Sequence, residues 1–332
     1  MAIAFPNGKR FAFTIIDDTD VATVENVAPV YRLLEDLGFR TTKTVWPVGC
    51  PEGSPDFCTS QTLEDAEYLS FVQDLQRRGF EVTWHGATME TSTRERTTRA
   101  LQRFRDALGD YPRVHVNHSY NRENLYWGAE RIDVPLLRFL GSKVLWRRQG
   151  AYLGHVQGSP YWWGDYCEHV RYARNLTFGE INLATVNPSM PYRDPARPLV
   201  PMWFSASDAE GASEFIELMH PEQQQKLEDE GGFCILATHL GKGYARDGHV
   251  HPLVRKRLES LARRPGWFPT VSQLLDWLHA RRNSEELPAR EWRRMQWRWA
   301  RDLLFRKSKR KRAAGDYPDI LPNELDDAAT GV

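Results

Sequence analysis

The sequence has few cysteines and no long apolar run. The four cysteines, Cys50, Cys58, Cys167 and Cys234, lack the paired spacing of a zinc finger. A disulfide between Cys50 and Cys58 is an alternative, but in a reducing compartment we expect all four to be free thiols. No stretch approaches the length of a membrane span, and the N-terminus has no basic start followed by an apolar run. By default these absences predict a cytoplasmic protein.

The chain also lacks net charge, since 44 basic residues balance 44 acidic ones. This balance argues against a dedicated nucleic-acid-binding protein, and we expect no nucleic-acid partner. The average hides an asymmetry: residues 290–312 hold 11 basic and two acidic residues, which leaves 33 basic and 42 acidic residues elsewhere. A length of 332 residues with 41% hydrophobic and 27% charged residues is typical of a globular protein with a sizeable core.

Short β-like runs alternate with helix-like stretches from residue 11 to about residue 280. Predicted strands cover residues 11–16, 41–46, 81–84, 113–117, 142–146, 199–204 and 232–238. Predicted helices cover residues 24–38, 63–78, 93–108, 211–229, 251–263 and 270–281. Residues 150–198, rich in Gly, Pro, Tyr and Trp, are interpreted as an irregular insertion. Such alternation predicts a parallel sheet, and six or seven units favour a barrel.

Reactive side chains stand at nearly every predicted strand end. They are Asp17 and Asp18, His85, His118, Arg147, Asp208 and His239. In a parallel barrel the C-terminal ends of the strands converge on one mouth, so together these groups could enclose a cation. Each also has an ordinary alternative, because Asp commonly caps helices and a histidine can simply be hydrogen-bonded within its own loop.

Three of these strand ends carry a family resemblance. "FTIIDD", "EVTWHG" and "CILATHLGKG" together resemble the polysaccharide deacetylases of the NodB-homology type, over roughly residues 11–278. The resemblance implies a distorted (β/α)7 barrel, here followed by a basic helical extension, and metal-dependent hydrolysis of acetamides on sugars. It implies Asp18 and His85 as metal ligands, Asp17 as general base and His239 as general acid. Zinc is the expected metal, with manganese or cobalt as alternatives.

The sequence departs from the family at the next metal ligand. The family places a second histidine four residues after the first, but residue 89 is Met, which is a poor zinc ligand. His118 and Glu90 are the two candidate replacements, and we favour His118. The family also places an Arg that orients the base near this strand end, whereas residues 117–119 contain none.

Aromatic residues beside the predicted mouth suit a carbohydrate partner. Trp127, Trp162 and Trp163, together with Arg147 and Asp208, are candidate substrate-binding residues, because sugar rings present flat C–H faces as well as hydroxyl groups. The alternative is a hydrophobic cluster under a long loop.

The C-terminal region differs from the predicted barrel in amino-acid composition. We expect the barrel over residues 1–283, a basic Trp- and Arg-rich helix over 284–312, and a disordered acidic tail over 313–332. Trp292, Met295, Trp299 and Leu303 share one helical face. This face either makes a peripheral membrane contact through residues 290–312 or docks on the barrel. The oligomeric state is left open.

The predicted function is therefore a metal-dependent hydrolase that removes an acetyl group from an N-acetylated sugar or polysaccharide. Two alternatives remain. One is a catalytically inactive barrel that binds glycan, for which Met89 and the missing Arg argue, and the other is a hydrolase of a different C–N amide bond.

Overall fold

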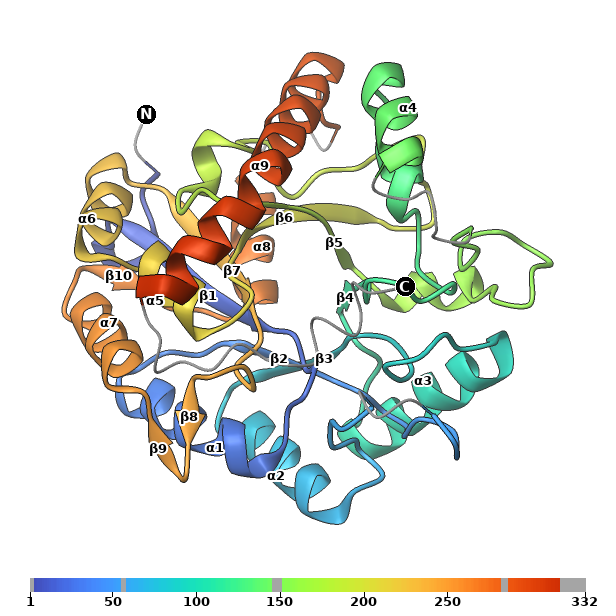
Figure 1. The fold of residues 1–332 in the computed structure, drawn as a ribbon, viewed down its shortest axis with the longest axis horizontal. Helices are drawn as coiled ribbons and strands as arrows, with labels where there is room; N and C mark the ends of the chain where they lie inside the picture. The colour runs from blue at the N-terminus through green and yellow to red at the C-terminus, as the bar shows by residue number, and fades with distance from the viewer. Residues whose placement is uncertain (1–2, 55–57, 145–150, 282–285, 317–332) are drawn as a thin grey trace.

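The computed structural model describes residues 3–54, 58–144, 151–281 and 286–316, with side chains described up to residue 304 (Figure 1). Seven parallel strands pair in chain order, and the last pairs with the first to close a barrel. They are β1 (Phe11–Asp17), β2 (Thr42–Val45), β3 (Glu81–Trp84), β4 (Val114–Val116), β5 (Tyr172–Phe178), β6 (Met202–Asp208) and β7 (Phe233–Thr238). The short β10 (Gly266–Trp267) also pairs with β1, and β8 (Ala245–Arg246) and β9 (His249–Val250) form a hairpin.

Helices surround this barrel and cover its outer surface (Figure 1). They are α1 (Val24–Asp36), α2 (Ala66–Arg77), α3 (Arg94–Leu108), α4 (Pro135–Val144), α5 (Ala212–Leu218), α6 (Pro221–Glu230), α7 (Pro252–Ala262), α8 (Val271–His279) and α9 (Ala289–Asp316). The predicted distorted (β/α)7 barrel with a C-terminal helix is confirmed.

Helix boundaries follow local chemistry. Thr23 and Asn26 form a reciprocal capping box that starts α1, with each side chain accepting a hydrogen bond from the other's backbone N–H. Helix α3 ends at Gly109, whose φ of 90° lies in the left-handed region.

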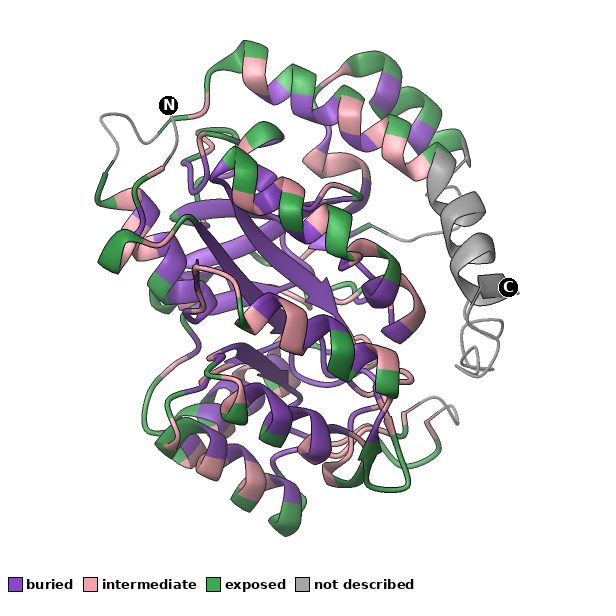
Figure 2. Cartoon of the chain, turned by 90° about the vertical axis from the view of Figure 1, so that its left-hand side faces the viewer, coloured by how far each residue is buried: buried purple, intermediate pink, exposed green. Residues whose placement is uncertain are grey.

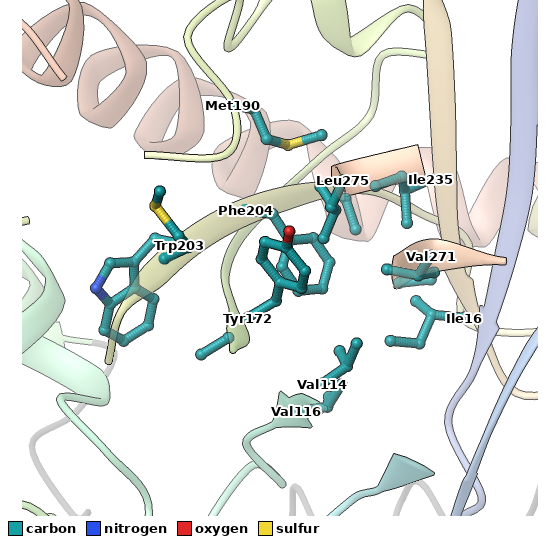
Figure 3. Packing of buried hydrophobic residues seen from close by; sticks show 14 of the residues in the cluster. Ile16, Val114, Val116, Tyr172, Met190, Trp203, Phe204, Ile235, Val271 and Leu275 are labelled. Atoms are coloured by element: carbon teal, nitrogen blue, oxygen red, sulfur yellow. The ribbon is translucent and has the colours of Figure 1, made fainter. Parts of the chain in front are cut away.

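Alternate residues of β1 face opposite sides of the barrel wall. Ile16 packs inside the barrel with side chains of β4, β5, β6, β7 and α8, as Figure 3 shows. Phe13 and Ile15 instead pack outside, with the apolar face of α1. Because side chains alternate with a period of two along a strand, Asp17 falls on the outer side and Asp18 on the inner side. Figure 2 shows the strands buried and the exposed residues gathered on the outer helices.

Two predicted elements are wrong. Residues 142–144 of the predicted strand at 142–146 belong to α4, and the remainder lies outside the described residues. A short apolar run does not distinguish a strand from a helix. The stretch at 150–198 is not wholly irregular, because it contains β5. The polar residues Arg174 and Asn175 interrupt the apolar pattern of β5, although both are buried.

The expectation of four free thiols is also wrong. Cys50 and Cys58 form a disulfide with a Cα–Cα distance of 6.2 Å, whereas Cys167 and Cys234 are free and buried. Both bridged residues belong to the loop between β2 and α2. The expectation rested on an assumed reducing compartment, and sequence spacing alone does not test that assumption.

Helix α9 docks on the barrel through the face that could have met a membrane. Trp292, Met295 and Trp299 are buried in the main hydrophobic cluster. The amide oxygen of Gln296 accepts hydrogen bonds of 2.9 Å from both Asp133 N and Val134 N, which ties α9 to the start of α4. The residues left exposed on α9 include Arg290, Arg293, Arg294, Trp297 and Arg301.

Any membrane contact through this region would therefore use the opposite face of α9. No helix in the described part of the chain combines the length and the apolar character needed to cross a bilayer. The helix also extends to Asp316, four residues into the segment expected to be disordered, and the rest of that segment lies outside the described residues.

Because α9 docks on the barrel through one face, replacing two tryptophans of this helix should destabilise the protein to different extents. Trp299 is 3% exposed and Trp297 is 49% exposed. Replacing Trp299 by Ala should lower the free energy of unfolding by about 3–5 kcal/mol, because a large buried side chain is removed. Trp297→Ala should change it by less than about 0.5 kcal/mol. Urea denaturation of the two variants checks this, and equal effects would contradict docking through Trp299.

Candidate functional site

Three imidazoles converge on one carboxylate at the mouth of the barrel. His85 follows β3, His118 follows β4 and His239 follows β7, while Asp20 lies three residues beyond the end of β1. The Nε2 atoms of His85 and His118 each lie 3.5 Å from an oxygen of Asp20, and the Nε2 of His239 lies 3.2 Å from one. The strand-end histidines predicted from the sequence are thus brought together, around an aspartate that sequence reasoning did not select.

Each histidine is oriented by a hydrogen bond on its other ring nitrogen. The Nδ1 of His85 lies 3.2 Å from the carbonyl oxygen of Val116, and the Nδ1 of His239 lies 2.8 Å from that of Glu210. The Nδ1 of His118 lies 3.1 Å from Oδ1 of Asn121. Carbonyl oxygens can only accept, so each Nδ1 carries a proton. In a neutral ring this leaves the lone pair on Nε2, which faces Asp20.

Three lone pairs facing a carboxylate repel one another unless a positive charge lies among them. That charge can be protons on some imidazoles or a cation held between the rings. The Oδ1 atom of Asp20 is buried and receives no hydrogen bond from any described residue. An orphaned carboxylate oxygen of this kind requires a partner.

The donor set fits a divalent metal. Two ligand atoms of a tetrahedral zinc at about 2.0–2.1 Å stand about 3.3 Å apart, which is close to the three oxygen–nitrogen distances observed here. Oriented histidines with an outer hydrogen-bond acceptor are typical of metal sites. The described residues nevertheless contain no preformed group of three or more His, Cys, Asp or Glu side chains with metal-site geometry, so binding would require the side chains to adjust.

Asp18 points into the same mouth and is held by an arginine. The guanidinium of Arg174, in β5, forms a bidentate pair with its carboxylate at 3.0 and 2.6 Å. Burial raises the pKa of Asp18, but the nearby charges of Arg174, His85 and His239 outweigh burial and hold it below its usual range. Arg174, in β5, thus places an arginine beside this carboxylate, although residues 117–119 contain none. The predicted role of Asp18 as a metal ligand is not favoured, because Arg174 already engages both of its oxygens.

Asp17 lies behind the mouth instead of in it. Both Asp17 and Lys43 have fully buried side chains, and Lys43 Nζ lies 2.9 Å from Asp17 Oδ2. The hydroxyl of Tyr31 donates to the same oxygen at 2.9 Å, and Leu240 N donates to Oδ1 at 2.9 Å. Because Asp17 lies on the outer side of the wall and not in the mouth, the geometry does not favour its predicted role as general base.

The buried charges divide the histidines into two kinds. Burial lowers the pKa of His85 to about 4, so this imidazole is neutral near pH 7. Burial and the charge of Lys242 lower the pKa of His239, but Glu210 and Asp20 outweigh them and raise it to about 9. Burial also lowers the pKa of His118, and its interaction with Asp20 reverses this. Burial raises the pKa of Asp20, and the charges of His118 and His239 bring it well below its ordinary value.

Of the two candidate replacements for the missing histidine, only His118 contacts the cluster around Asp20 in the described part of the chain. His118 contacts Asp20, whereas Oε2 of Glu90 accepts a hydrogen bond of 2.9 Å from the hydroxyl of Ser54. Asn121, which orients His118, donates in turn to Oε1 of Glu123 at 3.0 Å. The contact between His118 and Asn121 agrees with the alternative of a histidine hydrogen-bonded within its own loop, whereas sequence reasoning missed Glu123.

The predicted substrate-binding residues are scattered. Trp163 is 1% exposed and packs against Trp84, so it belongs to the core. Trp127 and Trp162 are partly exposed, and Arg131 stacks over the ring of Trp127 at 3.9 Å. Asp208 ends β6 and is half-buried. Arg147 lies outside the described residues.

No protein-family model and no curated protein matches this sequence. Solved structures similar over most of the chain include a protein assigned as a polysaccharide deacetylase from Mycobacterium smegmatis, with 14% identity, 86% of this chain and 96% of that chain covered and a TM-score of 0.49. Puue allantoinase has 11% identity, coverage of 83% and 93%, and a TM-score of 0.47. A family 4 acetyl xylan esterase from Clostridium thermocellum, in complex with a cobalt ion, has 11% identity, coverage of 84% and 98%, and a TM-score of 0.37.

The likeness to polysaccharide deacetylases indicated by the strand-end motifs is thus also found among solved structures. Each TM-score is below 0.5 and each identity is 14% or less, so these likenesses support no statement about activity. Inferences about chemistry depend on the side chains at the mouth of the barrel.

The buried pair of Lys43 and Asp17 predicts a large stability effect. Lys43→Met should lower the free energy of unfolding by about 3–5 kcal/mol, because it leaves a buried carboxylate without its counter-ion. The double variant Asp17→Leu/Lys43→Met should recover part of this loss, since no unpaired charge remains. Urea denaturation measures both, with the exposed Lys256→Met as the matched control. A loss under about 1 kcal/mol in Lys43→Met would show that the pair is not needed.

Glu123 predicts a pH dependence of stability. Burial raises its pKa to about 7, against about 4.5 in the unfolded chain. Between these values the native state binds more protons than the unfolded state, so this group's contribution to stability falls as pH rises from about 4.5 to 7. At about 1.4 kcal/mol for each pKa unit, the fall is at most about 3 kcal/mol.

Glu123→Gln should therefore become more stable relative to the parent protein as pH rises from 5 to 8. Urea unfolding of both proteins in the presence of a chelator measures the difference without a contribution from metal binding. A difference in stability that stays constant over this pH range would contradict the raised pKa.

Proposed function

We propose that the protein is a metal-dependent hydrolase that removes an acetyl group from an N-acetylated sugar or polysaccharide. The observation that supports it best is the set of three oriented imidazoles around Asp20, with the carboxylate of Asp18 at the same mouth. The strand-end resemblance to the polysaccharide deacetylases supplies the substrate class. The acyl group and the sugar belong to the proposal, as does the metal.

Asp20, His85 and His118 would hold the metal. His85 is neutral near pH 7, as a ligand must be, and a bound cation would also supply the positive charge that Asp20 otherwise takes from protonated histidines. We expect zinc, with manganese or cobalt as alternatives, because the donors are two imidazoles and one carboxylate. A bound divalent ion would polarise the acyl oxygen and make a water molecule a usable nucleophile near neutral pH.

Asp18 would act as general base. Its carboxylate is ionised, lies at the inner side of β1, and is fixed in orientation by the bidentate contact with Arg174. A carboxylate so held can accept a proton from the attacking water in a defined direction. This assigns to Asp18 the role predicted for Asp17, and assigns to Asp20 the role predicted for Asp18.

His239 would act as general acid. The charge of Glu210, which is not among the proposed metal ligands, raises the pKa of His239 and would favour a protonated ring. Its Nδ1 is engaged by the carbonyl of Glu210, which leaves an Nε2 proton for transfer. Protonation of the leaving nitrogen allows the amine to depart. His239 would thus be in contact with the metal-binding carboxylate without itself being a ligand.

Metal titration together with acetate release tests the proposal. By isothermal titration calorimetry, Asp20→Asn and His118→Ala should each bind zinc at least about 10-fold more weakly than the parent protein, because each loses a ligand. Glu90→Gln is the matched control and should bind zinc with unchanged affinity. Asp18→Asn should retain zinc binding but release acetate from N-acetylglucosamine oligomers at least about 100-fold more slowly.

Two outcomes would contradict the proposal. If the parent protein binds no zinc, manganese or cobalt, the metal site fails. If it binds metal but releases no acetate from acetylated sugars, the catalytic role fails, and the alternatives of an inactive glycan-binding barrel or of hydrolysis of another C–N amide bond take its place.

A further inference from the structure

The outer face of α9 carries a row of arginines. From residue 290 to residue 304, the exposed residues recur at helical spacing on the side of α9 that faces away from the barrel. They are Arg290, Arg293, Arg294, Trp297, Arg301 and Leu304. At about 3.6 residues per turn these positions fall within a sector of about 100°, and the row is about 21 Å long. We call this row the arginine face.

Most of the charge on the arginine face is unpaired. The first three arginines of the row form no ion pair with any described residue, and Arg301 lies 3.6 Å from Asp302 in a largely exposed contact. The two acidic residues among the described side chains of α9 accept hydrogen bonds from other elements. Glu291 accepts from the hydroxyl of Ser189 at 2.7 Å, and Asp302 accepts from Gly179 N at 3.2 Å. A row of positive charge with so little neutralisation attracts an anionic partner.

Large apolar side chains are exposed in the same row. Trp297 is 49% exposed and Leu304 is 80% exposed. Of the seven large hydrophobic residues that are exposed in the described part of the chain, five lie on α9 or α4. Gln296 attaches the start of α4 to α9, and Figure 1 shows both helices reaching the upper edge of the molecule. Exposed apolar residues concentrated at one edge are typical of an interaction surface.

This mixture of side chains favours a lipid surface over other anionic partners. An arginine can keep its guanidinium among lipid phosphates while its apolar stem covers the acyl chains. Tryptophan is enriched at the boundary between headgroups and hydrocarbon, and leucine is stabilised by entering the hydrocarbon. A nucleic acid would supply phosphates for the arginines but no apolar layer for Leu304.

We propose that the arginine face of α9 binds the surface of an anionic lipid bilayer. The contact is peripheral, because Trp292, Met295 and Trp299 are buried against the barrel and cannot enter the membrane while α9 is docked. Only Trp297 and Leu304 reach below the headgroups. One face of the helix thus holds it on the barrel, and the other holds the barrel at the membrane, independently of the reaction proposed above.

Flotation of the full chain with lipid vesicles tests the proposal. The protein should float with vesicles that contain phosphatidylglycerol and should not float with vesicles of phosphatidylcholine alone. Raising sodium chloride from about 0.05 M to about 0.5 M should release most of the bound protein, because salt screens exposed charges.

Two double variants with the same change in net charge locate the binding face. Arg293→Gln/Arg294→Gln should weaken binding to the anionic vesicles about 5-fold for each arginine removed, because each loses its attraction to the lipid charge. Arg32→Gln/Arg99→Gln, which removes two exposed arginines from α1 and α3, is the matched control and should bind as the parent protein does. Thermal melts confirm that both variants are folded.

Trp297→Ala separates a membrane from a purely electrostatic partner. It should weaken vesicle binding about 5- to 10-fold, because an exposed indole can no longer be removed from water. The same variant should bind a short DNA duplex as the parent protein does, since it retains every arginine.

Three results would overturn the proposal. One is a parent protein that does not float with phosphatidylglycerol vesicles at low salt. Another is equal weakening by the two double variants, which would show that net charge and not the arginine face determines binding. The third is a DNA duplex that displaces the protein from the vesicles while Trp297→Ala binds both partners unchanged, which would make α9 a nucleic-acid-binding surface instead.

Discussion

The ion pair between Asp17 and Lys43 fixes the part of the chain on which the candidate site depends. Both side chains are fully buried, so neither charge can be satisfied by water. Tyr31 attaches Asp17 to α1, and Leu240 N attaches it to the chain just beyond β7. Lys43 also reaches the hydroxyl of Thr19 at 3.3 Å, which extends the constraint to the segment that carries Asp18 and Asp20. A carboxylate that takes no part in the proposed chemistry thus determines where the next two carboxylates point.

Strand ends were predictable from the sequence, but the roles of the aspartates were not. His85, His118 and His239 each follow a strand recognised from its apolar run, so the barrel rule alone places them at one mouth. Asp17 and Asp18 are adjacent in the sequence, so their side chains face opposite sides of the barrel wall. The alternation of Phe11 and Phe13 with the smaller Ala12 and Thr14 was the available signal, because it marks the odd positions as the side that packs on helices.

Arg174 and Asp20 were missed for different reasons. Arg174 lies in β5, a strand that was not predicted because its buried polar residues interrupt the apolar pattern. Its role, to pair with the carboxylate of Asp18, can be recognised only in the folded structure. Asp20 stands beyond the strand end, where an aspartate is normally interpreted as a turn or cap residue. The sequence allowed a disulfide between Cys50 and Cys58, but compartment, not spacing, decides whether a nearby cysteine pair is oxidised.

The different roles proposed for His85 and His239 follow from the charges next to each one. His239 has Asp20 on one side and Glu210 on the other, so a proton on its ring is stabilised. His85 has Trp46 packed against its ring and Arg174 among the charges that disfavour its protonation, so burial prevails and the ring stays neutral. A neutral imidazole can donate a lone pair to a cation, and a protonated one can donate a proton to a leaving group.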